Sequence, residues 1–152
     1  FALRKFIFSE RAEILPNPLI LDANENMVEI GYDKDILIIN FWATWCAPCK
    51  KEMPSLNSLA QNMKYEDIQI ITIASGRNSK EAIDGFFDDN NLVNLKKYRD
   101  PRGRIAVKYG VTALPTTVVI SPKGIEIGRI IGDIDWDTAD VRSFFKKLLE
   151  TK

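Results

Sequence analysis

The two cysteines of the chain, Cys46 and Cys49, stand three positions apart in the segment FWATWCAPCK, residues 41–50. A continuous apolar run over 35–42 precedes them and an amphipathic pattern follows, so we expect Cys46 where a buried strand ends and a helix begins. The first N–H groups of a helix lack intrahelical partners and carry the positive end of the helix dipole. A thiolate at Cys46 is therefore favoured.

Cys49 follows one helical turn later and is expected beside Cys46, in a more deeply packed position. This arrangement suits disulfide exchange, in which Cys46 attacks a substrate disulfide and Cys49 then resolves the mixed disulfide. Pro48 stiffens the segment between them and removes one N–H donor. Trp45 offers a flat apolar edge to a protein substrate.

Other uses of two close thiols remain open at this stage. A structural disulfide would close a very small loop and remove little chain entropy. A zinc site would need carboxylates to complete four ligands, so no metal site is expected. A copper carrier or a catalytically idle adaptor could also present two thiols, although the chain has no histidine to assist a copper ion.

Composition narrows the function further. The 152 residues are 45% hydrophobic, 28% charged and balanced at 21 acidic and 21 basic side chains, which fits a globular domain without a general attraction to nucleic acid. The absence of histidine excludes Ser-His-Asp triads and histidine metal sites. No apolar run reaches the roughly 20 residues that span a bilayer. The chain starts at Phe1, and we expect residues 1–14 to follow a removed signal or membrane anchor, with one domain over 15–152.

The elements that must position the cysteines follow from periodicity and turn residues. We predict an extended pair over 14–30 around a turn at Asn24–Asn26, and strands over 35–42, 68–74, 116–120 and 125–131, with a shorter extended piece over 94–100. Helices are predicted over 47–61, after Ser79, within 101–110 and at the C-terminus, the last capped by Asp135 or Asp137. This order predicts an α/β fold with a central mixed β-sheet, helices on both faces and an N-terminal β-hairpin extension.

Three segments carry a family resemblance. FWATWCAPCKKEMP (41–54), VTALPTTVVISPKGIEIGRIIG (111–132) and DIDWDTADVRSFF (133–145) resemble the thioredoxin superfamily, above all its TlpA-type, membrane-anchored periplasmic branch. The resemblance covers about residues 15–150 and implies a thioredoxin-like fold. It implies a cis bond between Leu114 and Pro115, with Pro115 beside Cys46 and the backbone of Leu114 pairing with substrate. Thr116, Trp45 and Gly132 complete the expected substrate rim.

One departure concerns proton transfer. Asn40 stands where cytoplasmic thioredoxins carry a buried aspartate, and an amide cannot exchange a proton. Glu52 is near in sequence, but we expect its helical position to direct it away from the cysteines. The group that deprotonates Cys49 is therefore left open between water and the leaving thiolate.

The pair Ala47-Pro48 donates no hydrogen bond that would stabilise a thiolate, and Lys50 adds only a solvated charge. We therefore expect a reductase, with a potential nearer about −270 mV than about −120 mV. The resemblance implies a monomeric soluble domain that needs no cofactor, takes electrons from a membrane donor and reduces protein disulfides. It points to clients in copper-site assembly of cytochrome oxidase, with cytochrome c maturation as the alternative.

Charged side chains also cluster in the second half of the chain. The basic cluster comprises Lys96, Lys97, Arg99, Arg102 and Arg104, and aspartates gather over 84–89 and 133–140. Exposed charges of this kind are usually solvated, and we expect these to be surface faces rather than partner sites.

Overall fold

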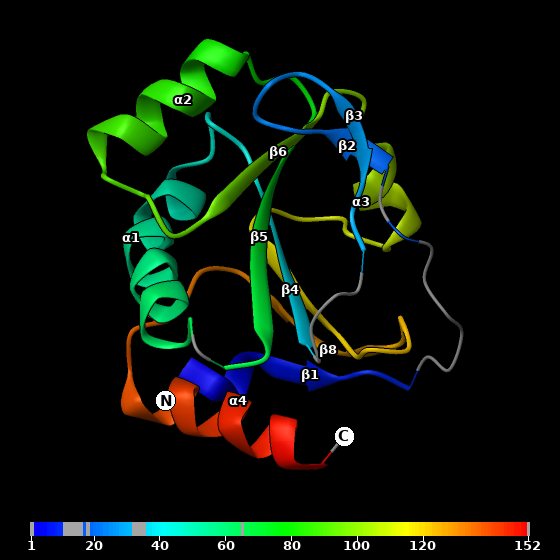
Figure 1. The fold of residues 1–152 in the computed structure, drawn as a ribbon, viewed down its shortest axis with the longest axis vertical. Coiled ribbons are helices and arrows are strands. Elements are labelled where there is room, and N and C mark those ends of the chain that lie inside the picture. The colour runs from blue at the N-terminus through cyan, green and yellow to red at the C-terminus, as the bar shows by residue number, and fades with distance from the viewer. Residues whose placement is uncertain (1, 11–16, 18, 32–35, 65, 152) are drawn as a thin grey trace.

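The computed structural model describes residues 2–10, 17, 19–31, 36–64 and 66–151 (Figure 1). Its strands are β1 (Phe6–Phe8), β2 (Leu19–Leu21), β3 (Met27–Glu29), β4 (Ile36–Trp42), β5 (Ile68–Ser75), β6 (Lys96–Asp100), β7 (Thr116–Ile120) and β8 (Glu126–Ile131). Its helices are the 3-10 helix η1 (Ala2–Lys5), α1 (Ala47–Asn62), α2 (Lys80–Asp89), α3 (Arg104–Lys108) and α4 (Ala139–Thr151).

Within these residues the strands form one sheet in the order β1-β8-β7-β4-β5-β6-β2-β3. The β4–β5 and β5–β6 pairs are parallel, whereas β7 and β8 run antiparallel to their neighbours. The crossovers between the parallel strands are α1 and α2, as the alternating sequence pattern predicts. The mixed sheet of the sequence prediction is therefore confirmed.

Both faces of the sheet are covered, which explains why every residue of β4 is buried. On one face, alternate strand residues such as Ile36 and Ile38 pack with side chains of α1, α2 and α4. On the other face, Leu37 and Ile39 pack with α3 and the β2–β3 hairpin. Figure 1 shows α1 and α2 on one side of the central strands and α3 on the other. The active-site strand is thus held rigidly between two apolar layers.

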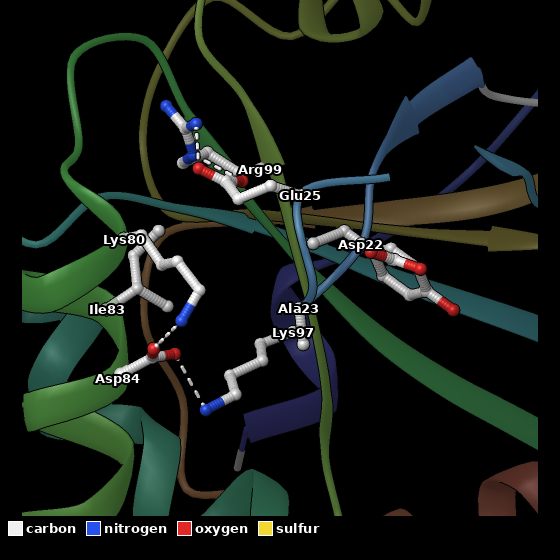
Figure 2. A pocket seen from close by; sticks show the side chains of 9 residues that line it. Asp22, Ala23, Glu25, Lys80, Ile83, Asp84, Lys97 and Arg99 are labelled. Atoms are coloured by element: carbon white, nitrogen blue, oxygen red, sulfur yellow. Dashed lines mark hydrogen bonds and ion pairs between the residues drawn. The ribbon is translucent and has the colours of Figure 1, made fainter. Parts of the chain in front are cut away.

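The predicted N-terminal hairpin is present as β2 and β3, and it extends the sheet beyond β6. Its turn is closed by Asp22, whose carboxylate accepts hydrogen bonds from the backbone N–H groups of Asn24 and Asn26. Glu25 adopts a positive φ of 62° in this turn, and its carboxylate pairs with Arg99 of β6 (Figure 2). The ion pair fastens the tip of the hairpin to the edge of the parallel sheet.

Strand β1 was not predicted from the sequence. It pairs antiparallel with β8 at the opposite edge of the sheet, and Phe6 packs against Phe144 of α4. Gly128 permits this pairing, because a Cβ there would stand 2.5 Å from the carbonyl oxygen of Ile7. The predicted domain start at residue 15 lies outside the described residues. None of the described helices is both long enough and apolar enough to cross a bilayer.

The predicted cap of the C-terminal helix is wrong. Thr138, not Asp135 or Asp137, caps α4, since its hydroxyl accepts a hydrogen bond from Val141 N at 3.2 Å. Asp135 instead accepts from the backbone N–H of Asp137. The carboxylate of Asp137 contacts Arg142, one turn into the helix. The two aspartates thus shape the turn before the helix rather than the helix end itself.

Candidate active site

The two cysteines lie at the N-terminus of α1. Cys46 is the residue that precedes the first helical turn, with φ −100° and ψ 105°, and Pro48 occupies that first turn as expected. The carbonyl of Cys46 accepts the first intrahelical bond, from Lys50 N at 3.1 Å. The predicted placement at a strand-to-helix junction is therefore confirmed.

Cys46 and Cys49 are joined by a disulfide, with their Cα atoms 5.3 Å apart. Cys49 is fully buried, as the sequence predicts, and Cys46 is 7% exposed. Cys46 is thus less accessible than expected, because it packs into the same apolar cluster as Cys49 and Met53. Cys46 therefore opens into a groove rather than onto an open surface.

That groove has a volume of about 570 Å³ and is formed where the active-site segment faces the loop before β7. It brings together five of the predicted site residues: Trp45, Cys46, Ala47, Pro48 and Leu114. Its remaining wall comes from the end of β5, from α3 and from the loop that follows α3: Ser75, Ala106, Val111, Thr112 and Ala113. The side chain of Trp45 is exposed at its edge. The groove therefore combines an apolar wall with Cys46, the one cysteine of the pair that solvent can reach.

The loop at Leu114 has the backbone expected from the resemblance, since the bond between Leu114 and Pro115 is cis. Pro115 and Thr116 are buried at the start of β7 and do not line the groove. The hydroxyl of Thr116 donates to the carbonyl of Ala113 at 2.6 Å. Gly132 N donates to the carbonyl of Pro115 at 2.8 Å, at a φ of +96° that favours glycine. Thr116 and Gly132 thus support the loop, while Leu114 faces the groove.

The side chain of Glu52 is buried, which the sequence analysis did not predict. Glu52 is only 2% exposed, and its Oε1 accepts a hydrogen bond from Asn40 Nδ2 at 2.7 Å. Its Oε2 accepts from Trp136 Nε1 at 3.1 Å and from Ile134 N at 3.2 Å. The signal that could have placed it is its spacing, because Glu52 follows Cys49 by three positions and so shares the buried side of α1.

Burial raises the pKa of Glu52 from 4.5 to about 7, and the hydrogen bonds from Asn40, Trp136 and Ile134 oppose the rise only in part. The carboxyl group can therefore both take up and release a proton near neutral pH. Asn40, expected as an inert replacement for an aspartate, is fully buried and also donates to the Thr117 hydroxyl at 2.9 Å. Asn40 of β4 thus holds the carboxyl group of Glu52 of α1 in a buried hydrogen bond.

The loop before the cysteines is held by a residue that the sequence prediction missed. The side-chain carbonyl oxygen of Asn78 accepts from Thr44 N at 2.7 Å and from the Thr44 hydroxyl at 2.9 Å. Its amide nitrogen donates to the backbone carbonyls of Ser75 at 3.0 Å and Gly76 at 3.3 Å. Asn78 therefore connects the turn that carries Trp45 to the end of β5. Lys50, which we expected to support the site, is exposed to solvent.

Comparison with known proteins places this site in a family. The AhpC/TSA family profile matches residues 22–126, a span that contains both cysteines, the hairpin turn and the loop before β7. The chain belongs to the AhpC/TSA family. The thiol-disulfide oxidoreductase ResA of Bacillus subtilis is 32% identical over 118 residues, covering 77% of this chain and 65% of that protein. ResA of Bacillus cereus is 33% identical over 139 residues, covering 88% of this chain and 79% of that protein.

Structure comparison agrees on the fold. The thioredoxin domain of a thiol-disulfide oxidoreductase from Bacteroides vulgatus superposes with a TM-score of 0.76 at 15% identity, covering 93% of this chain and 99% of that domain. This member of the AhpC/TSA family thus has a thioredoxin-like fold, as the sequence resemblance implies. With relatives of this name and a Cys46–Cys49 disulfide at the helix start, it is a thiol–disulfide oxidoreductase.

Proposed function

We propose that the protein reduces disulfides of other proteins, with Cys46 as the attacking thiol and Cys49 as the resolving thiol. The observation that carries the proposal is the Cys46–Cys49 pair at the start of α1, where Cys46 alone opens onto the groove beside Leu114. A substrate disulfide entering this groove meets Cys46 first, because Cys49 is fully buried. The roles of the two thiols follow from this difference in access.

The exchange balances in two steps. The Cys46 thiolate attacks one sulfur of the substrate disulfide, forms a mixed disulfide and releases the other substrate sulfur as a thiolate that takes a proton from water. Cys49 then loses its proton and attacks the sulfur of Cys46, which forms the Cys46–Cys49 disulfide and releases the second substrate thiolate. Two electrons pass from the cysteine pair to the substrate, so a donor must reduce the pair again.

Glu52 is the proposed acceptor of the Cys49 proton. Both side chains are buried on the same side of α1, three positions apart, where side chains lie about 5–6 Å from one another. A carboxyl group whose pKa is about 7 is partly ionised at neutral pH and is matched to proton transfer there. Asn40 and Trp136 hold its two oxygens in fixed directions. We propose Glu52 in place of the two acceptors that the sequence left open, water and the leaving thiolate.

The direction of the reaction is inferred from what surrounds the attacking sulfur. No side-chain hydrogen bond caps the helix at Cys46, and Ala47 and Pro48 provide no polar side chain between the cysteines. A reduced form without such stabilisation makes the pair a reductant rather than an oxidant. The family resemblance supports a periplasmic protein, anchored at the membrane and recharged by a membrane electron donor. It supports cysteines of metal- or haem-loading proteins as clients, at the copper site of cytochrome oxidase or, as the alternative, in cytochrome c maturation.

The test is a turnover assay on a protein disulfide with dithiothreitol as the electron donor, using the protein, Cys46→Ser and Cys49→Ser. We expect Cys46→Ser to be inactive, and Cys49→Ser to accumulate a mixed disulfide that mass spectrometry detects on Cys46. Full reductase activity in Cys46→Ser would refute the assigned roles. Tight, stoichiometric Cu(I) binding without any thiol turnover would favour a copper carrier instead.

A further inference from the structure

A second groove lies on the other side of α3 from the catalytic groove. It has a volume of about 380 Å³, and the hairpin residues Leu19, Leu21 and Met27 face Ile105 of α3 across it. Leu19 and Met27 are 59% and 60% exposed, so the hairpin presents apolar side chains to solvent. Figure 1 shows the hairpin and α3 side by side. Exposed apolar side chains gathered at a groove are a common mark of a binding surface.

The rim of this groove is cationic, being formed by Arg102, Arg104 and Lys108. Within the described part of the chain, none of these three side chains lies within 4.0 Å of a carboxylate oxygen. Asp100, which also lines the groove, is buried, and its carboxylate accepts a hydrogen bond from Ile105 N at 2.7 Å. The positive charge of the rim is therefore available to a partner.

Two other members of the predicted basic cluster, Lys97 and Arg99, form ion pairs within the protein. Figure 2 shows Lys97 paired with Asp84 of α2 and Arg99 paired with Glu25 of the hairpin turn. Lys97 Nζ also lies 5.4 Å from the ring centre of Phe87. These residues hold α2 and the hairpin in place. Members of one basic cluster in the sequence thus have different surroundings: Lys97 and Arg99 form ion pairs, whereas Arg102 and Arg104 lie on the rim of the second groove.

The two grooves share α3. Ala106 lines the catalytic groove, whereas Arg104, Ile105 and Lys108 line the second one. A helix with its side chains is only about 10 Å across, so one extended segment of roughly six residues reaches from one groove to the other. Val107, on the same helix, is 77% exposed. A protein lying in the catalytic groove is therefore well placed to occupy the second.

We propose that the groove between the hairpin and α3 is a second docking site for the same protein substrate. It takes a segment that combines apolar side chains with carboxylates and lies next to the substrate disulfide. The inference rests on the proposed disulfide reductase activity and adds substrate selectivity to it. Apolar side chains of the segment lie on Leu19 and Met27, and its carboxylates pair with the three rim cations.

The test uses two kinds of synthetic peptide with the same internal disulfide. In one, six alternating Leu and Asp residues adjoin the disulfide, and in the other six alternating Leu and Asn residues do so. Each kind is made in two forms, with the six residues placed before or after the disulfide. The variant Arg102→Glu/Arg104→Glu/Lys108→Glu reverses the charge of the groove rim from positive to negative. The matched control, Lys123→Glu/Lys146→Glu/Lys147→Glu, makes the same change of charge at exposed positions outside both grooves. A small aromatic disulfide that contacts only the cysteines reports the basal chemistry.

We expect kcat/KM for the Asp peptide to exceed that for the Asn peptide and to fall about tenfold in the rim variant, through KM, with the control unchanged. The preference should shrink as salt rises from 50 to 500 mM. Equal rates for both peptides with normal turnover of the small disulfide would overturn the docking site and leave the reductase standing. Failure to turn over the small disulfide would instead refute the reductase itself. Rim-dependent binding to anionic vesicles, or rim-dependent dimerisation, without peptide preference would also overturn the proposal.

Discussion

The buried carboxyl of Glu52 makes stability depend on pH in a way that a conservative substitution removes. The change is Glu52→Gln, which keeps the shape of the side chain and can still accept hydrogen bonds from Trp136 Nε1 and Ile134 N. Asn40 can turn its amide toward the new NH₂ group, because its Oδ1 has no hydrogen-bond partner among the described residues. The variant should therefore fold and keep the hydrogen bonds from Trp136 and Ile134.

The sign of the effect follows from proton uptake. The pKa of Glu52 is about 7 in the folded protein and 4.5 when the side chain is exposed in the unfolded chain. Between these two pH values the folded state therefore binds more protons than the unfolded state. The free energy of unfolding then falls as pH rises from about 4.5 through about 7, and becomes flat above. At about 1.4 kcal/mol per pH unit, the rise in pKa corresponds to a loss of about 3 kcal/mol. Glu52→Gln does not suffer this loss.

The assay is urea unfolding of the oxidised protein at pH 4.5 to 8.5, with Glu150→Gln, at an exposed site of α4, as the control. We expect Glu52→Gln to gain about 3 kcal/mol relative to the parent between the two ends of this range, while groups common to both proteins cancel in the difference. A stability difference that stays constant with pH would refute the assignment of a neutral, buried carboxyl at position 52.

Three further substitutions test the supports of the site and the sheet. Asn78→Ala removes the acceptor of both Thr44 hydrogen bonds, and we expect the free energy of unfolding to fall by about 1–3 kcal/mol and the loop to be proteolysed faster. Unchanged stability and proteolysis would show that these hydrogen bonds do not stabilise the loop. Arg129→Leu removes the two hydrogen bonds to Glu126 and those to the carbonyls of Tyr109 and Gly110, and we expect a loss of about 1–3 kcal/mol in chemical denaturation, whereas an unchanged stability would show that these contacts contribute nothing. Gly128→Ala should release β1 from β8, seen as faster hydrogen exchange over residues 6–8, since the new Cβ would collide with Ile7 O.

Much of the fold was predictable because local patterns and tertiary packing agree. The apolar run that became β4 is buried on both faces, and the amphipathic stripe after Cys46 became α1 over Ala47–Asn62. Ser79 caps α2 as predicted, its hydroxyl accepting from Ala82 N at 3.0 Å. The position of the cysteines was predictable for the same reason, since a buried strand followed by a helix leaves few places for the residues between them.

The errors arose where distant residues decide the outcome. A glutamate in a helix usually faces solvent, and the donors that make burial of Glu52 possible come from distant segments: Asn40 of β4 and, before α4, Ile134 and Trp136. Strand β1 has three residues, too few to show a period, and exists because β8 offers an open edge. Asn78 acts on Thr44 across 34 positions of sequence, with no motif that links them.

The reduction potential of the Cys46–Cys49 pair tests the central claim most directly. The protein is equilibrated in glutathione or dithiothreitol buffers of known reduction potential, and its free thiols are then trapped. Mass spectrometry gives the oxidised fraction of the cysteine pair at each potential. A reductase should have a potential of about −270 mV, because no polar side chain between the cysteines stabilises the reduced form. A value of about −120 mV would make the protein an oxidant and contradict the proposed reductase.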